Sequence, residues 1–405
     1  MSGLSPDLLA LLARASLEPA APEPIRVLGA EDWARLARMD GYRLAAIWAD
    51  RDRAIGLLEV DQHIAPIATD NPEAAMAVMR AAHPDVAPVA PSEAFAVMPG
   101  DGVYQIGAGP VGGILAMAAH RRLHVAGDRL VHVEHRFGYV HRGLSALITG
   151  KSPRAAARFA ARISGGATVA HALAFARAAE AASGVAVPEL ALLIRDAMAD
   201  TERCVASLLA LAGLADDCGV PALASRLIEA RDAIAAASET IFFHRLMMDM
   251  VVPGGLDTVP RLADIPAMIT ALRAVRPAVL GFGAWRWRRR WADMAALVRP
   301  RVWQAIDAAE AAGARFERCD GSAEAGPWLT ALPAASGSGL GQAENADQPI
   351  YCFVRLEGGF IEFCGIANGG LAAVAALEQA APGLTVEGFA RRAHLLMPPI
   401  GMIDL

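Results

Sequence analysis

The chain has 405 residues and a formal net charge of −6, so it is long enough for two or three domains and is not a general nucleic-acid-binding protein. Hydrophobic residues make up 55% of the sequence, but no apolar run reaches the roughly 18 residues of a membrane-spanning helix. Its five cysteines form no C-x-x-C pair, and its start lacks the basic and apolar regions of a secretory signal. We therefore expect a protein of the reducing cytoplasm that is not itself transmembrane.

The N-terminal region alternates short patterns of helix and strand. Helical spacing covers Glu31–Met39, and two apolar runs, Arg43–Ala49 and Ala54–Val60, are separated by charged residues that predict a hairpin turn. The proline-rich segment His83–Pro99 has the composition of a linker. We predict a small α/β region with a linker over residues 1–99.

The next stretch contains a possible nucleotide-binding fingerprint. Gly107, Gly109 and Gly112 satisfy G-x-G-x-x-G after an apolar run, a possible helix follows, and Glu134 comes later. In such a turn the glycines let backbone N–H groups approach a pyrophosphate, and the later acid holds the ribose. No further strand–helix–strand units follow, so we interpret the pattern as coincidence and keep an FAD- or NAD-binding enzyme as an alternative.

The same stretch is rich in histidine. His120 and His124 have the i,i+4 spacing that places two side chains on one face of a helix, as in some zinc sites, and His132 and His135 follow. No carboxylate or cysteine completes the set at a telling spacing. We therefore favour buried or hydrogen-bonded structural histidines over metal ligands.

The middle of the chain predicts a helical bundle. Ser152 and Pro153 start one helix, and Gly165–Gly166 breaks the pattern that follows. A second helix runs from Pro188 to about Ala212, and a third from Pro221 to about Val252, where Pro253 stops it. Long helices with short connections indicate a bundle core.

The C-terminal third mixes predicted elements. Pro266–Arg276 is helical in pattern, and the run Trp285–Trp291 interleaves tryptophan with arginine, which favours a protein interface over a nucleic-acid or lipid surface. Ala323–Asp347 is rich in small residues and predicts a loop. Two strands, Pro349–Phe353 and Gly358–Phe363, and a helix over Leu371–Gln379 complete the pattern. The fold class is α+β and mainly α: a helical-bundle core, a small α/β N-terminal part and a β-rich segment.

Four blocks of sequence carry a family resemblance. They are, in order, GDGVYQIGAGPVGG, HVAGDRLVHVEHRFGYVHRG, GKSPRAAARFAARISGGATVAHALAF and FFHRLMMDMVVPGG. Together they resemble the large subunit of membrane-bound nickel–iron hydrogenases of the formate-hydrogenlyase type, a relative of the 49 kDa subunit of respiratory complex I. The resemblance covers about Asp101–Leu256 well and Pro349–Leu405 loosely. It implies a large-subunit-like domain over residues 100–405, preceded by a shortened relative of the 30 kDa complex I subunit.

The resemblance also identifies missing chemistry. The family's nickel–iron centre needs four thiolates from two C-x-x-C pairs. The first pair falls on Ser164 and Ala167, and the second should lie within His394–Leu405, which has no cysteine. Cys352 and Cys364 lie upstream with eleven residues between them and do not restore a pair. The resemblance therefore implies that no nickel–iron centre of the family's kind forms, and that this chain holds no cofactor.

Four candidate site residues remain: Arg162, His171, His120 and Glu134. The family places a histidine at the position of His171, close to the partner's iron–sulfur cluster, so tuning of that cluster and simple packing both stay open. Complex I holds its quinone with a histidine and a bundle tyrosine. All four tyrosines of this chain lie outside the predicted helices, so quinone binding is not supported residue by residue.

The resemblance thus implies a nickel-free scaffold, coupling or electron-transfer subunit. Its complex would be related to formate hydrogenlyase and to the NADH:quinone oxidoreductase, on the inner face of the cytoplasmic membrane. The implied partners are a small subunit that carries an iron–sulfur cluster and antiporter-like membrane subunits. Whether the chain is itself an enzyme stays open. The alternatives are an oxidoreductase subunit that binds quinone or another oxidant in the emptied cavity, and the FAD- or NAD-binding enzyme.

Overall fold

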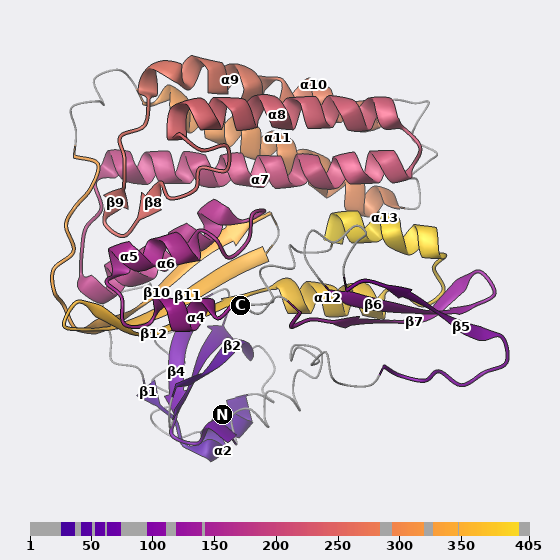
Figure 1. The fold of residues 1–405 in the computed structure, drawn as a ribbon, viewed down its shortest axis with the longest axis horizontal. Helices are drawn as coiled ribbons and strands as arrows, with labels where there is room; N and C mark the ends of the chain where they lie inside the picture. Colours follow the sequence, from indigo (N-terminus) through magenta and orange to yellow (C-terminus); the bar gives the residue numbers. More distant parts are fainter. Residues whose placement is uncertain are drawn as a thin grey trace.

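The structure is a computed structural model that describes residues 26–36, 42–50, 53–60, 63–73, 95–110, 119–139, 142–283, 294–319, 327–346 and 348–396. Long helices form one side of the molecule, and three small sheets lie on the other side (Figure 1). The fold is α+β and mainly α, as predicted. The predicted Trp285–Trp291 interface and the predicted linker up to residue 94 lie outside the described residues.

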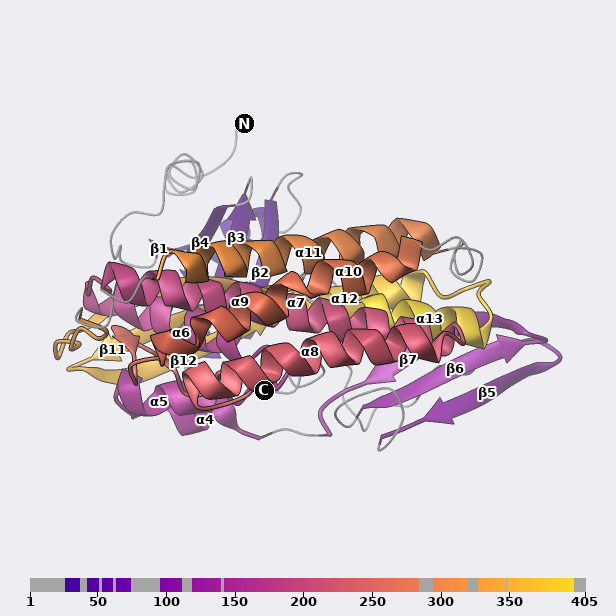
Figure 2. The same ribbon diagram turned by 90° about the horizontal axis from the view of Figure 1, so that it is seen from above.

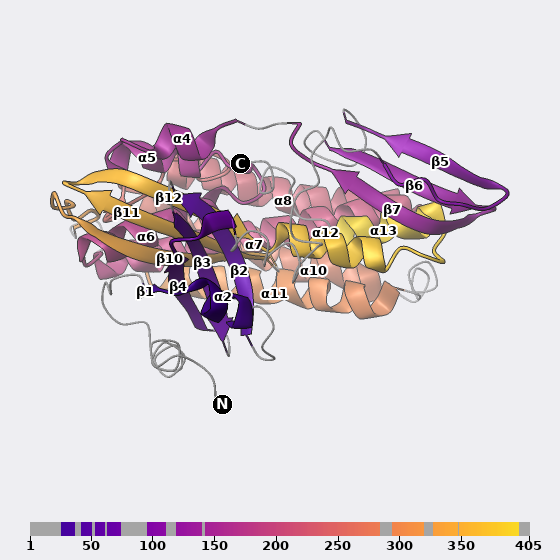
Figure 3. The same cartoon turned by 90° about the horizontal axis from the view of Figure 1, so that it is seen from below.

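The N-terminal unit is a four-stranded sheet with a short helix. The strands have the order β1-β4-β3-β2, and their bounds with the helix are β1 Arg26–Val27, α2 Ala30–Leu36, β2 Tyr42–Asp50, β3 Arg53–Val60 and β4 His63–Thr69. The antiparallel pairing of β2 with β3 confirms the predicted hairpin. The Trp48 indole N–H donates to the Ile366 carbonyl at 3.2 Å, and its ring lies against Gly365, where a side chain would clash. The unit is thereby docked on the sheet β10–β12 (Figure 3).

In the helical part, several helices begin at the serine and proline residues that were predicted to start them. Its elements are α4 Leu144–Ile148, α5 Pro153–Ala160, α6 Thr168–Ser183, α7 Glu189–Asp217, α8 Pro221–Phe242, α9 Ile265–Arg273, α10 Val275–Val279 and α11 Ala295–Glu317. The Ser152 hydroxyl accepts the Ala155 N–H and caps α5. Seen from above, α7, α8, α9 and α11 run along the length of the molecule (Figure 2).

The predicted end of the third helix at Val252 is wrong. Helix α8 ends at Phe242, and Phe243 adopts a positive φ of 60°. The chain then turns through residues 243–250 into the hairpin of β8 Val251–Val252 and β9 Gly255–Leu256. Apolar residues in this turn continue the helical spacing, and the spacing alone does not show that the backbone turns back.

The predicted loop over Ala323–Asp347 is also wrong in part, because Gly337–Asn345 forms strand β10. Gly337, Gly339 and Gly341 alternate along this strand, and a side chain on any of them would collide with backbone atoms of α6. The glycines therefore let the helix lie directly on the strand. They also remove the apolar alternation that would have identified a strand. Strands β11 Gln348–Glu357 and β12 Phe360–Asn368 complete an antiparallel sheet in the order β10-β11-β12 and confirm the two predicted strands.

A second antiparallel sheet has the order β5-β6-β7, with bounds β5 Val103–Ala108, β6 His120–Ala126 and β7 Arg129–Arg136. One face packs Leu123, Val125 and Val133 against helices α12 Gly370–Gln379 and α13 Val386–Leu396. Helix α12 was predicted, whereas α13 was not. Strand β6 occupies the C-terminal part of the helix that the fingerprint interpretation required.

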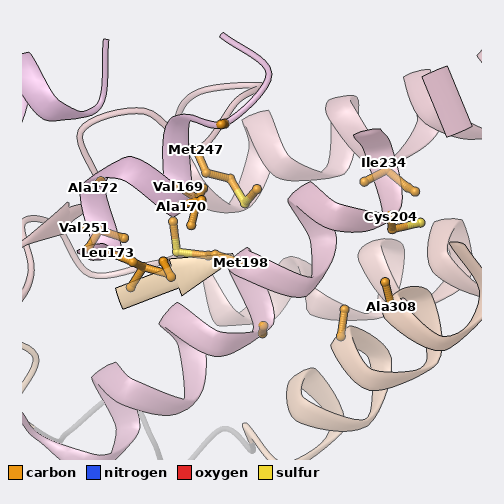
Figure 4. Close-up of a cluster of buried hydrophobic side chains, with 14 of the residues drawn as sticks. Val169, Ala170, Ala172, Leu173, Met198, Cys204, Ile234, Met247, Val251 and Ala308 are labelled. Atoms are coloured by element: carbon orange, nitrogen blue, oxygen red, sulfur yellow. The ribbon is translucent and has the colours of Figure 1, made fainter. Parts of the chain in front are cut away.

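The main hydrophobic core lies between the helices and the sheet β10–β12. Figure 4 shows part of it, with Val169 and Ala170 of α6, Met198 and Cys204 of α7, and Ile234 of α8. The apolar helical stretch Leu262–Phe282 passes a length-and-composition test for a membrane span. However, 44% of its apolar 18-residue window is buried inside the molecule, where α9 packs against α8 and α11, and core helices pass the same test.

Candidate functional site

The candidate site is built around the turn Ser164–Ala167, which joins α5 to α6. The Ala167 N–H donates to the Ser164 carbonyl at 3.1 Å, and the Gly166 N–H donates to the Ser164 hydroxyl at 3.4 Å. Ser164 and Ala167 are buried, whereas Gly165 and Gly166 are exposed. The turn therefore presents two glycines outward and keeps the two positions that matter to the family resemblance inside.

Arginine side chains fix this turn from outside. Arg142 donates to the carbonyls of Arg162 at 2.8 Å and Ile163 at 2.5 Å. The Arg162 guanidinium forms a two-pronged ion pair with Asp249, in which the second hydrogen bond measures 2.6 Å. The bonds from Asp249 raise the pKa of Arg162 above its ordinary value. Arg162, a predicted site residue, thus ties the turn to the 243–250 segment.

The 243–250 segment has an unusual backbone. Phe243, Met247 and Asp249 all have positive φ without being glycine, which costs free energy and persists where surrounding contacts require it. His244 holds the segment by accepting the N–H groups of Leu246 at 3.1 Å and Met248 at 3.4 Å on Nδ1. This strained segment places the Asp249 carboxylate where Arg162 meets it.

His171, the second predicted residue, lies one helical turn into α6 and is buried. Its Nδ1 is 2.7 Å from the Ala167 carbonyl oxygen. Because a carbonyl only accepts, Nδ1 carries the proton and Nε2 is an acceptor in the neutral ring. Burial lowers the pKa of His171 to about 4, so the ring is neutral at pH 7. Its buried Nε2 has no partner within the described residues.

Glu202 reaches the same helix from α7. Its carboxylate accepts the N–H of Val169 at 2.7 Å and of Ala170 at 2.9 Å, and Thr168 adds a third backbone bond. Burial raises the pKa of Glu202 to about 7 against the effect of these bonds. Glu202 is not among the candidate site residues predicted from the sequence, because a contact between α6 and α7 leaves no local signal in the sequence.

Asn345, at the end of β10, is a second residue that the sequence did not identify. Its side-chain N–H donates to the Gly166 carbonyl at 3.1 Å, and its buried Oδ1 has no partner among the described residues. It lies in the segment that was predicted to be a loop. The alternating glycines around it hid the strand that positions it.

The other two predicted residues, His120 and Glu134, lie on the sheet β5–β7. Glu134 accepts from His124 at 2.9 Å, from Arg136 at 2.7 Å and from the Ala96 N–H at 2.9 Å. Burial works to raise the pKa of Glu134, but the bonds from His124 and Arg136 outweigh it and hold the pKa below its ordinary value. Glu134 is therefore ionised, and its hydrogen bonds hold together the side chains on this face of the sheet. Within the described part of the chain, no hydrogen bond or ion pair joins this face to the Ser164–Ala167 turn.

The histidines of this region have structural partners. The predicted helical face of His120 and His124 is wrong, since both lie in strand β6. His135 lies on the opposite face of the sheet from His124 and contacts Glu378 at 2.8 Å. Among the residues that the structure describes, no three His, Cys, Asp or Glu side chains form a group that could hold a metal ion.

The glycine fingerprint also has a structural explanation. Strand β5, with Gly107, pairs antiparallel with β6, the next strand of the chain, whereas a dinucleotide fold requires parallel strands joined by a helix. Gly109 approaches the Ala119 carbonyl so closely that a side chain would collide with it. Gly112 lies outside the described residues. The close approach to Ala119, and not a phosphate, accounts for Gly109.

Cys352 and Cys364 prove to be neighbours in space, with their sulfurs 3.8 Å apart on β11 and β12. The sequence separation hid this contact. Cys352 lies opposite Gly341 in the sheet, and Gly341 faces Ala174 in the middle of α6. Burial raises the pKa of the Cys352 thiol well above its ordinary value. The pair therefore belongs to the core below the middle of the helix, not to the Ser164–Ala167 turn.

The residues at this turn do not fit a thiolate-bound nickel. The Ser164 hydroxyl accepts a backbone hydrogen bond, and the Ala167 side chain is a buried methyl group. Neither offers a soft anionic ligand.

Comparisons with known proteins confirm the predicted resemblance. Residues 142–209 match the nickel-dependent hydrogenase family. The carbon monoxide-induced hydrogenase of Rhodospirillum rubrum is 27% identical over 153 residues, which are 38% of this chain and 42% of that protein. The match thus spans less than half the length of this relative.

Solved structures share the fold. A chain of the membrane-bound sulfane sulfur reductase, an archaeal respiratory membrane complex, superposes with a TM-score of 0.67 at 16% identity over 76% of this chain and 100% of that chain. The nickel–iron–selenium hydrogenase of Desulfovibrio vulgaris Hildenborough superposes with a TM-score of 0.62 at 13% identity over 75% of this chain and 100% of that chain. The family match includes Arg142, Ser164, Ala167, His171 and Glu202, which make up the geometry described above.

Proposed function

We propose that this chain, a homologue of the nickel-dependent hydrogenase large subunit, is a nickel-free scaffold or coupling subunit of a membrane-associated redox complex. The observation that carries the proposal is the contrast at the Ser164–Ala167 turn. The positions that resemble the first ligand pair hold a hydroxyl and a methyl group, whereas the arginine and aspartate frame around them is complete. A frame retained without the ligands indicates that the turn serves a structural or coupling role.

The same turn supports docking of a partner. Gly165 and Gly166 are exposed, and a side chain on Gly165 would meet no atom within 4 Å. His171, which contacts the Ala167 carbonyl of the same turn, holds an acceptor nitrogen that no described residue satisfies. A buried acceptor without a donor costs free energy. The proposed partner is an iron–sulfur small subunit that covers the glycines and supplies this donor.

The relatives support a membrane setting. One is part of an archaeal respiratory membrane complex, and another is a carbon monoxide-induced hydrogenase. We extend this to a peripheral subunit on the inner face of the cytoplasmic membrane, with antiporter-like membrane subunits as further partners and no cofactor bound by this chain. No observation at the site favours quinone, so we do not propose that this chain is an oxidoreductase subunit that binds quinone or another oxidant in an emptied cavity.

Affinity purification of the full chain from its own host after gentle solubilisation tests the proposal. We expect an iron–sulfur protein and polytopic membrane proteins to co-purify. Gly165→Arg should reduce the recovered partner at least tenfold, because the turn is its docking point. Gly313→Arg is a matched control, since Gly313 lies on α11 in open space, and it should leave recovery unchanged. A lone chain, or equal recovery with both variants, would contradict the docking assignment.

A further inference from the structure

Glu202 is a buried carboxylate whose bonding differs from that of the other buried acids. Its described partners are the backbone N–H groups of Thr168, Val169 and Ala170, the first turn of α6. No ion pair of the described residues includes it. The surroundings are apolar, with Val169, Ala170 and Met198 packed in the core (Figure 4).

The charged groups on neighbouring elements are engaged elsewhere. Arg203, the next residue of α7, and Arg315 of α11 both pair with Asp200. Glu344 of β10 lies 3.7 Å from Arg203. On the turn side, Arg142 is bound to backbone carbonyls, and His171 is neutral and bonded to the Ala167 carbonyl. Within the part of the chain that the structure describes, Glu202 therefore has no cation of its own.

Two opposing effects act on this carboxylate. Burial without a counter-ion disfavours the charged form. The N-terminus of α6 favours it, through three N–H donors and the positive end of the helix dipole. Burial outweighs the donors and raises the pKa of Glu202 to about 7, so both the charged and the neutral form are populated near neutral pH.

We propose that Glu202 is a proton-binding site, and that its charge sets how firmly the first turn of α6 is held against α7. Uptake forms one O–H bond on the carboxylate and consumes one proton from water, and release reverses it. The ionised form accepts three charge-assisted bonds. The neutral form weakens these bonds but removes the larger cost of a buried charge, so protonation holds the turn more firmly against α7.

The first turn of α6 is continuous with the candidate docking turn. The Thr168 hydroxyl donates to the Ser164 carbonyl at 3.2 Å, and the His171 N–H donates to the Ala167 carbonyl at 3.2 Å. Loosening this turn therefore reaches Gly165, Gly166 and the unpaired nitrogen of His171. The part of the inference in which proton uptake is coupled to a partner rests on the proposed function. The binding and release of a proton at Glu202 do not.

Hydrogen–deuterium exchange of the full chain, over a pH range that brackets 7, tests the inference. After correction for intrinsic exchange, the peptide with Thr168–Ala170 should exchange at least about tenfold faster above the titration than below it, because opening the turn exposes the carboxylate to water and returns its raised pKa towards the ordinary value. Glu202→Gln should remove this pH dependence. Glu229→Gln, an exposed acid on α8, should keep it.

Further measurements keep the inference falsifiable if the glutamine variant folds poorly. Glu202→Asp keeps a carboxyl group and should keep pH-dependent exchange. Infrared spectra of the wild type should show a carboxylic-acid band that titrates near neutral pH and is absent from Glu202→Gln. Wild-type exchange that does not change with pH, or a titration that survives in Glu202→Gln, would overturn it. None of these readouts needs a partner, so their failure is distinct from failure of the proposed function.

Discussion

Two buried carboxylates lie near opposite ends of α6, and their surroundings differ. Glu180, near the C-terminal end, binds the Arg195 guanidinium at 2.8 Å and the Gly254 N–H at 2.8 Å. Arg195 also donates to the carbonyls of Val252 and Gly255. Among the described residues, Glu202, near the N-terminal end, has only backbone donors. A paired buried charge fixes a structure, whereas an unpaired one can change its charge at moderate pH.

The largest expected effect comes from breaking the paired end. Arg195→Met should lower the free energy of unfolding by about 3–5 kcal/mol, because it leaves Glu180 charged and buried and removes the donor to two carbonyls. Chemical denaturation measures this. Arg154→Met, which removes an exposed pair with Asp257, is the control and should cost less than about 1 kcal/mol. Equal costs for the two variants would show that the Glu180 pair does not hold the hairpin.

The unpaired carboxylate of Glu202 should make the free energy of unfolding depend on pH. The pKa of Glu202 rises from 4.5 to about 7 on folding, so the folded state binds a proton that the unfolded state has released. The proton bound by Glu202 therefore adds to the free energy of unfolding below pH 4.5, and this stabilisation is lost as the pH rises towards 7. With about 1.4 kcal/mol for each pKa unit, wild type should lose about 3 kcal/mol relative to Glu202→Gln across this range. Denaturation at several pH values checks this. A constant difference between the two proteins would contradict it.

The packing of α6 on β10 should not depend on the charge of Glu180 or of Glu202. Gly341→Ala should destabilise by about 1–3 kcal/mol at every pH, because the added methyl group meets the Ala174 carbonyl. The thermal midpoint at two pH values measures this. Gly313→Ala, in open space on α11, should be neutral or stabilising by up to about 1 kcal/mol. A pH-dependent cost at Gly341 would mean that the strand contact and the Glu202 proton are linked.

The smallest effect is expected at the exposed frame of the turn. Arg162 and Asp249 are both more than a third exposed, so Asp249→Asn should cost no more than about 1 kcal/mol. Its effect on recovery of the partner should be larger than its effect on stability, because it frees the docking turn. Paired denaturation and co-purification measurements separate the two. Severe unfolding would show that the 243–250 segment depends on this pair.

Local sequence signals predicted much of the fold. Proline and serine marked the starts of α5, α7 and α8. Apolar runs predicted the hairpin β2–β3, and strand-like patterns predicted β11 and β12. The failures share a physical cause. Strand β10 has glycine where it contacts α6, so its buried face carries no hydrophobic signal. Helix α8 ends in a turn whose residues keep the helical spacing.

The candidate site was predicted in part. The resemblance named Arg162, Ser164, Ala167 and His171, and in the structure they lie at or beside one turn; their role as a functional site stays a prediction. The resemblance gave no indication of what Glu202 and Asn345 contact, because both act across helices and strands that are distant in sequence. His120 and Glu134 were grouped with the site by the resemblance, but they belong to the network of another sheet.

The central claim is that this homologue works in a complex without nickel. Elemental analysis of the affinity-purified native complex, normalised to this subunit, tests it most directly. We expect iron, carried by the co-purified partner, and no stoichiometric nickel. One nickel per subunit would contradict the account, because Ser164 and Ala167 would then have to lie beside a metal centre held by residues that have not been assigned here.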